Sequence, residues 1–134
     1  MAGSAFEVEY HDTGTVKKVV IDWTSDNVTL GVAGDLKKIS GLLLKAITDP
    51  DAGSAPAANY DIVLTDEEGA DLLGNCEDDL MDRHTANTES VDFMVLGTGC
   101  TGRPCVDDII TVTVTNCGAG NNEGRIVLYW MGST

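Results

Sequence analysis

The sequence predicts an all-β fold, an antiparallel β-sandwich or jelly roll of seven to eight strands. Short segments alternate apolar and polar residues, as strands with one buried face do. Stretches rich in Gly, Asn, Asp and Pro separate these segments, and 15 glycines suit many tight turns. The length of 134 residues indicates a single sandwich domain over residues 14–134, preceded by an N-terminal arm of residues 1–13.

The clearest hairpin signal is the stretch NYDIVLTDEEGADLL at residues 59–73. Tyr60, Ile62 and Leu64 share one face of an extended chain and form the expected buried side. The turn DEEG that follows ends in a glycine, which accepts a positive φ at little steric cost. Ala70–Leu73 is expected to return as a short second strand.

The N-terminal half contains two further expected strands. Val16–Thr24 alternates and places Trp23 in the core rather than on a binding surface. Ser25–Asn27 has the composition of a turn. Val28, Leu30 and Val32 alternate again and predict the next strand.

The stretch DLKKISGLLLKAI at residues 35–47 fits two structures. Its apolar residues fall at a helical spacing, with Asp35 as a possible N-cap. However, Ser40–Gly41 interrupts the pattern, and the surrounding segments all favour strands. We therefore expect a strand over Ser40–Thr48. The residues that would form the helical stripe are Leu36, Ile39, Leu43, Ala46 and Ile47.

Three expected strands lie in the C-terminal half: Glu89–Leu96, Ile109–Thr115 and Arg125–Met131. The last is apolar on both faces, which is typical of a strand in the centre of a sheet. The residues expected in the core are Trp23, Tyr60, Ile62, Leu64, Val112, Val114, Leu128 and Trp130.

The formal net charge of −14, from 22 acidic and 8 basic residues, disfavours binding to nucleic acid or to anionic membranes. The chain has neither a basic leader nor an apolar run of about 20 residues, so we expect no secretory signal and no membrane span. Crowded copies of so acidic a chain repel one another. We therefore expect self-assembly to strengthen with salt or divalent ions, whereas assembly favoured by low ionic strength would indicate a basic docking partner.

No catalytic arrangement is recognisable, and we expect a protein that is not an enzyme and binds no cofactor. The two histidines, His11 and His84, have no neighbouring nucleophile motif. Carboxylates gather at residues 66–71 and 77–82, where calcium is the most plausible ligand. Neither cluster has EF-hand spacing, so solvated turns without metal are the expectation.

Four cysteines occur, and their state stays open. Cys100 and Cys105 bracket a Gly- and Pro-containing loop that can close as a small disulfide ring. Cys76 and Cys117 complete a set of four, but the tight pair spacing of structural zinc sites is missing. Reduced thiols are the default for a chain without an export signal.

Several segments together resemble small structural proteins of tailed bacteriophages. They are, in order, VKKVVIDWTSD, SGLLLKAITDPDAGSAPAANYDIVLTDEEGADLL, RHTANTE and ITVTVTNCGAGNNEGRIVLYW. The resemblance covers most of the chain from residue 16 onward and supplies no catalytic residues. It implies a virion protein that decorates or cements the capsid shell, with a head-fibre or tail component as an alternative. The implied partners are the major capsid protein or other virion proteins together with further copies of this chain. The implied location is the virion, assembled in the host cytoplasm.

A second resemblance is to bacterial prepeptidase C-terminal β-sandwich modules, through the order of YDIVLTDEEG, ESVDFMVL and IVLYW. It implies an extracellular module that binds carbohydrate or calcium. Both resemblances imply a β-sandwich.

The arm is the candidate contact with a partner. Phe6, Val8 and Tyr10 alternate along it, and we expect them to be apolar yet poorly provided with core partners. An edge strand of this kind can add to a neighbouring sheet through backbone hydrogen bonds. A frayed terminus is the alternative.

Overall fold

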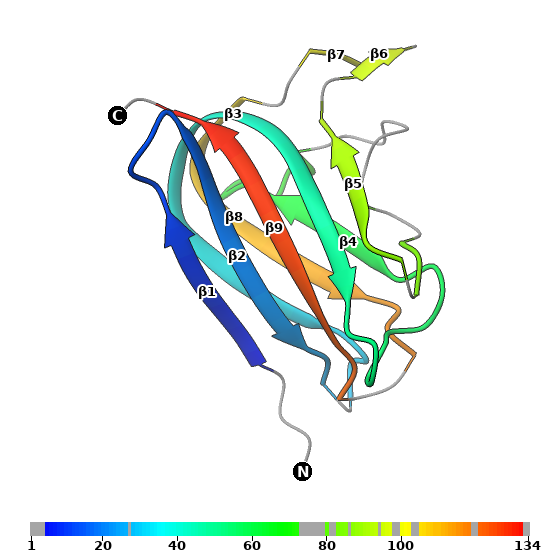
Figure 1. The fold of residues 1–134 in the computed structure, drawn as a ribbon. Coiled ribbons are helices and arrows are strands. Elements are labelled where there is room, and N and C mark those ends of the chain that lie inside the picture. Colours follow the sequence, from blue (N-terminus) through cyan, green and yellow to red (C-terminus); the bar gives the residue numbers. More distant parts are fainter. Residues whose placement is uncertain are drawn as a thin grey trace.

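The computed structural model describes residues 5–26, 28–72, 80, 83–85, 87–93, 95–97, 100–102, 105–118 and 121–132, and all of its regular structure is β (Figure 1). Seven strands form one antiparallel sheet in the order β1-β2-β9-β3-β8-β4, with β5 paired to β3; β6 and β7 form a separate pair. The predicted all-β antiparallel fold is confirmed. The strands are β1 (Ala5–His11), β2 (Val16–Thr24), β3 (Val32–Pro50), β4 (Asp61–Thr65), β5 (Glu89–Asp92), β6 (Val95–Gly97), β7 (Cys100–Gly102), β8 (Cys105–Thr115) and β9 (Glu123–Met131).

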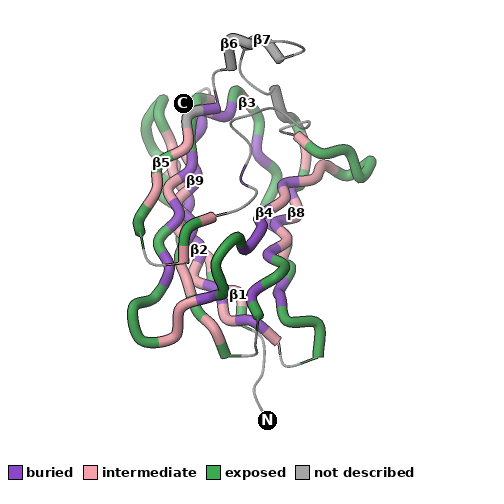
Figure 2. The backbone as a smooth tube through the Cα atoms, turned by 90° about the vertical axis from the view of Figure 1, so that its right-hand side faces the viewer, coloured by how far each residue is buried: buried purple, intermediate pink, exposed green. Residues whose placement is uncertain are grey.

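The large sheet folds over on itself into two layers, which gives the sandwich-like form. Figure 2 shows β2, β5 and β9 on one side and β4 and β8 on the other. The 19-residue β3 joins the two layers, because its first part, Val32–Leu42, pairs with β8 and its second part, Leu42–Pro50, pairs with β9. β9 lies between β2 and β3, so the prediction that it is a central strand is confirmed.

The bend of β3 lies at Gly41. Its φ is 144°, and a Cβ there would lie 1.9 Å from the carbonyl oxygen of Met131. Only glycine allows the backbone of β9 to come this close at a strand corner.

The expected strand over Ser40–Thr48 is confirmed and is longer than predicted. Register shifts occur between Asp35 and Lys38 and between Leu43 and Lys45. Each shift inserts extra residues into a strand and so displaces its period-two pattern. The buried positions Leu36, Ile39, Leu43 and Ala46 therefore acquire a helix-like spacing within a bent strand.

Two of the predicted strands are wrong, and the strand predicted over Glu89–Leu96 is divided into β5 and β6, which belong to different sheets. The first wrong prediction is the strand at Val28–Val32. Val28 and Thr29 belong to a turn, in which Oδ2 of Asp26 accepts hydrogen bonds from both backbone N–H groups at 3.1 and 3.0 Å. Leu30 follows with a φ of 57°, so the strand begins only at Val32. The side-chain hydrogen bonds from Asp26 satisfy these backbone N–H groups in place of the hydrogen bonds of a strand ladder.

The return strand expected at Ala70–Leu73 is reduced to a single bridge between Thr65 and Asp71, while Leu73 lies outside the described residues. The turn before it is as predicted, with Gly69 at a φ of 83°.

All eight residues predicted for the core are buried, none more than 3% exposed. Trp23 on β2 and Tyr60 before β4 meet between the layers, with ring centroids 5.9 Å apart. The pattern did not identify Leu80 and Cys117, which are also buried. In the described part of the chain, no helix is long and apolar enough to cross a membrane.

Candidate interaction surface

The arm residues predicted to contact a partner lie on β1. This strand pairs with β2 over its whole length, from Ala5 opposite Thr24 to His11 opposite Lys18. Its exposure alternates, so Phe6, Val8 and Tyr10 point inward and pack against the core. Residues 12 and 13 lie in the turn that leads to β2, and residues 1–4 lie outside the described chain.

The inward side chains of β1 contact the first part of β3. The Phe6 ring covers Gly34, where a Cβ would lie 2.2 Å from the ring. The Tyr10 hydroxyl accepts a hydrogen bond from the backbone N–H of Lys37 at 2.7 Å, and the Lys37 ammonium lies 4.3 Å from the centre of the Tyr10 ring. These contacts hold β1 against the sandwich, so its inward side chains already have partners within the chain.

The turn after β1 is held by lysines. Lys37 forms an ion pair with Asp12, and the hydrogen bond between these two side chains is the main cause that lowers the pKa of the Asp12 carboxyl. The Lys17 ammonium donates to the backbone carbonyls of Asp12 and Gly14 at 2.8 and 2.7 Å. The C-terminal end of β1 is thereby held in place.

β1 is the terminal strand of the sheet (Figure 1). Among the described residues it pairs only with β2, so its outer side presents backbone N–H and C=O groups that no described strand covers. Such an edge is a template for pairing with another chain. The side chains that flank this edge on the outer face are Ala5, Glu7, Glu9 and His11, all exposed.

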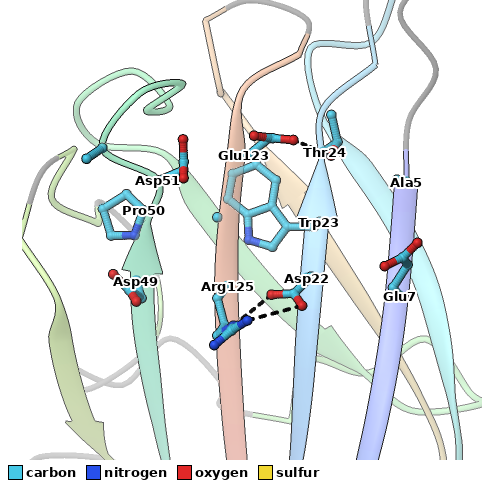
Figure 3. Close-up of a pocket in the computed structure, with 12 residues that line it drawn as sticks. Ala5, Glu7, Asp22, Trp23, Thr24, Asp49, Pro50, Asp51, Glu123 and Arg125 are labelled. Carbon is cyan, nitrogen blue, oxygen red and sulfur yellow. Dashed lines mark hydrogen bonds and ion pairs between the residues drawn. The ribbon is translucent and has the colours of Figure 1, made fainter.

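The outer face of the layer is acidic at one end. The strand register places Glu7, Asp22, Arg125 and Asp49 in one row across β1, β2, β9 and β3. Figure 3 shows the hollow at this end, with a volume of about 640 Å³. Five carboxylates and one guanidinium line it. The carboxylates are those of Glu7, Asp22, Asp49, Asp51 and Glu123.

Among the described residues that line this hollow, Arg125 is the only cation, and it is bonded to one carboxylate. Arg125 donates through Nε and Nη2 to both oxygens of Asp22, at 2.7 and 3.3 Å. This bond is the main cause that raises the pKa of the guanidinium, and the charges of Asp49 and Glu9 act in the same direction. Of the described residues that line the hollow, the carboxylates therefore outnumber the cations, and the guanidinium is already bonded to Asp22.

The opposite end of the same strands is apolar. Val16, Met131 and Leu42 are register neighbours across β2, β9 and β3. They are 57%, 43% and 40% exposed. We call them the apolar row. Sequence reasoning missed this row, because the three residues lie in different segments, two of them at strand ends. Only the strand register brings them together.

The first acidic turn is structural. Oδ1 of Asp66 accepts from the backbone N–H groups of Glu68 and Ala70 at 3.0 and 2.9 Å. Oε1 of Glu67 accepts from the N–H of Ile109 at 3.1 Å. Of the second cluster, residues 77–79 and 82 lie outside the described chain.

His84 lies in an exposed turn, where Nδ1 accepts from the N–H of Asn87 at 2.9 Å. His11 lies on β1, 3.4 Å from a carboxylate oxygen of Glu9. The two histidines are therefore not brought together.

Cys117 is a free thiol in the core, and burial raises its pKa to about 11. Cys76 and the side chains of Cys100 and Cys105 lie outside the described part, so the disulfide and zinc alternatives remain predictions.

Within the described ranges, no three His, Cys, Asp or Glu residues are arranged to hold a metal ion. No family model, curated protein or solved structure matches the chain. The fold and the surface thus define an all-β, sandwich-like protein. One of its layers carries an edge strand whose outer side pairs with no described strand, an acidic hollow and an apolar row.

Proposed function

We propose that this chain is a non-catalytic structural protein of a tailed-bacteriophage virion, which decorates or cements the capsid shell by binding alone. The observation that supports the proposal is the layer that carries β1, because an edge strand whose outer side pairs with no described strand lies on the same sheet as the apolar row. The combination offers backbone hydrogen bonds and apolar area for docking, while the acidic residues keep the rest of the face soluble.

Decoration acts through mass action. A protein that binds the assembled lattice but not its dissociated subunits stabilises the lattice. A compact domain held by backbone contacts suits this role, because the product is needed in many copies. A head-fibre or tail location requires the same kind of contact and is the nearest alternative.

The first test is whether purified virions contain the chain in many copies. Virions without it would end the proposal. The neighbouring genes provide a further check: virion genes on either side favour decoration, whereas a secreted hydrolase in the same reading frame favours the extracellular carbohydrate- or calcium-binding module.

The second test asks which surface docks. Val16→Ser together with Met131→Ser should weaken co-sedimentation with particles that lack the protein, because both side chains are exposed and would lose apolar contact. Val28→Ser is the matched control, since Val28 is 87% exposed on a turn away from this row. Attachment that is unchanged in the double variant would exclude the apolar row as the contact.

Removal of residues 1–13 should also weaken attachment. This deletion takes away β1 and uncovers the core beside β2, so its fold must be verified by circular dichroism before the result is interpreted.

A further inference from the structure

We propose that the outer edge of β1 is a strand-addition site for an extended partner segment that carries Lys or Arg at alternate positions. The site lies along Glu7–Glu9, next to the acidic hollow. The inference deepens the proposed function by naming the partner's chemistry. It rests on the proposed function only in one respect, namely that a virion protein supplies the segment.

The first argument is that the edge is open and held in shape. β1 pairs only with β2 among the described strands, and its contacts through Phe6 and Tyr10 fix it from the inner side. An incoming strand would therefore meet a preformed ladder and would not have to order β1, which removes a cost of binding.

The second argument is charge. Glu7 and Glu9 are exposed and flank the edge on its outer face, with Asp22 and Asp49 further along the Glu7 row. The nearby guanidinium of Arg125 is bonded to Asp22, and His11, which lies opposite Lys18, is 3.4 Å from Glu9, so Glu7 is the carboxylate with the more acidic surroundings. A residue directly opposite in a new strand would lie about 4.5–5.5 Å from Glu7 or Glu9 between Cβ atoms, where opposite charges attract and like charges repel.

The third argument is that like charges disfavour the antiparallel pairing of β1 with β1 of a second copy. β1 has seven residues. In an antiparallel pair of two β1 strands, the exposed residues of both copies lie on the same face only if the symmetry centre falls on a residue, because side chains alternate with period two. Centring on Glu7 places it opposite Glu7 of the second copy, and centring on Glu9 does the same for Glu9. Centring on Val8 places Glu7 opposite Glu9 twice. Every register that keeps at least five of the strand's residue pairs therefore opposes two carboxylates.

The two glutamates thus discourage edge-to-edge self-pairing, which natural sheets commonly oppose with charged side chains. The same charges favour a strand with basic residues at the facing positions, so one feature selects against self-association and for a basic partner.

The test uses two synthetic peptides with the intact chain, TKVKVKT and TEVEVET, each with blocked termini. At low ionic strength we expect the basic peptide to bind about tenfold or more tightly than the acidic one in isothermal titration. Its binding should weaken with added salt and should slow amide hydrogen exchange along β1.

The charge-reversed variant Glu7→Lys with Glu9→Lys should invert the preference, so that the acidic peptide binds more tightly. The control, Glu67→Lys with Glu68→Lys, changes the net charge equally on the turn before Gly69 and should keep the preference for the basic peptide. If both variants lost the preference for the basic peptide equally, the preference would come from the overall charge of the chain, and the proposal would be overturned.

Absence of binding by the basic peptide to the folded chain, or binding without protection of β1, would also overturn it. A wild-type dimer through β1 in analytical ultracentrifugation would assign the edge to a second copy instead. All these measurements use the isolated chain in solution. Peptide binding at β1 can therefore be found even if the chain does not attach to virions, and attachment can be found even if the peptide does not bind.

Discussion

At the scale of single residues, the core is organised around the contact between Trp23 and Tyr60. Gly124 lies opposite Trp23 on β9, and a Cβ there would lie 2.6 Å from the indole ring. The glycine therefore makes room for one of the two tryptophans of the core. Tyr60 and Cys117 are buried titratable groups, and burial raises their pKa values to about 12 and about 11.

These shifts predict loss of stability at alkaline pH. The folded chain favours the neutral phenol and thiol. Their contribution to the free energy of unfolding is therefore fully present at pH values below the pKa values of the unfolded chain. It is lost between about pH 10 and 12 for Tyr60 and between about pH 9 and 11 for Cys117. Urea unfolding at pH 8 and pH 11 should show that Tyr60→Phe reduces this loss. Tyr129→Phe, on the outer face of β9, is the control and should leave it unchanged; an equal loss in all three proteins would contradict the prediction.

At the scale of elements, β3 is the strand on which the fold depends, because it takes part in both layers. Its bend at Gly41 and its two register shifts let one strand pair first with β8 and then with β9. The same shifts produce the helix-like spacing of its apolar residues. A helical pattern that is interrupted by Ser-Gly and surrounded by strands thus indicates a bulged strand.

Gly41→Ala should destabilise the fold more than Gly69→Ala. Both glycines have a positive φ, of 144° and 83°, so both variants incur backbone strain of about 1–2 kcal/mol. A Cβ at position 69 meets nothing within 4 Å, whereas one at position 41 meets the Met131 carbonyl at 1.9 Å. Overpacking should add about 1–3 kcal/mol to the loss at position 41. Equal free energies of unfolding for the two variants, measured in urea, would refute the role of the close approach.

At the scale of the whole molecule, the net charge of −14 opposes compaction and keeps copies apart. The carboxylates are not spread evenly, because five of them line one hollow beside β1 while the apolar row lies at the other end of the same strands. One layer therefore combines an electrostatic and an apolar region, and the proposed docking uses both.

Salt should stabilise the isolated chain. Raising NaCl from about 10 to 150 mM shortens the Debye length from about 30 to 8 Å and screens the repulsion among carboxylates. We expect Tm to rise by about 2–4 °C, measured by calorimetry. The Glu67→Lys, Glu68→Lys variant should show a smaller rise. A Tm that falls with salt would mean that attractive pairs such as Arg125 with Asp22 dominate.

The sequence by itself determined the all-β class, the eight core residues and the central place of β9. These depend on local alternation and on apolar residues that need burial, both of which are visible along the chain. It did not determine the turn at Val28, where the Asp26 carboxylate competes with the ladder for backbone N–H groups.

Only the tertiary structure decided how the strands pair, and with it the surface. β1 comes first in the chain and takes the sheet edge, while β9 comes last and inserts between β2 and β3. The row of Glu7, Asp22, Arg125 and Asp49 joins residues from four strands, and the apolar row joins three. Register between distant segments is set by packing across the whole sheet, so no local pattern contains it.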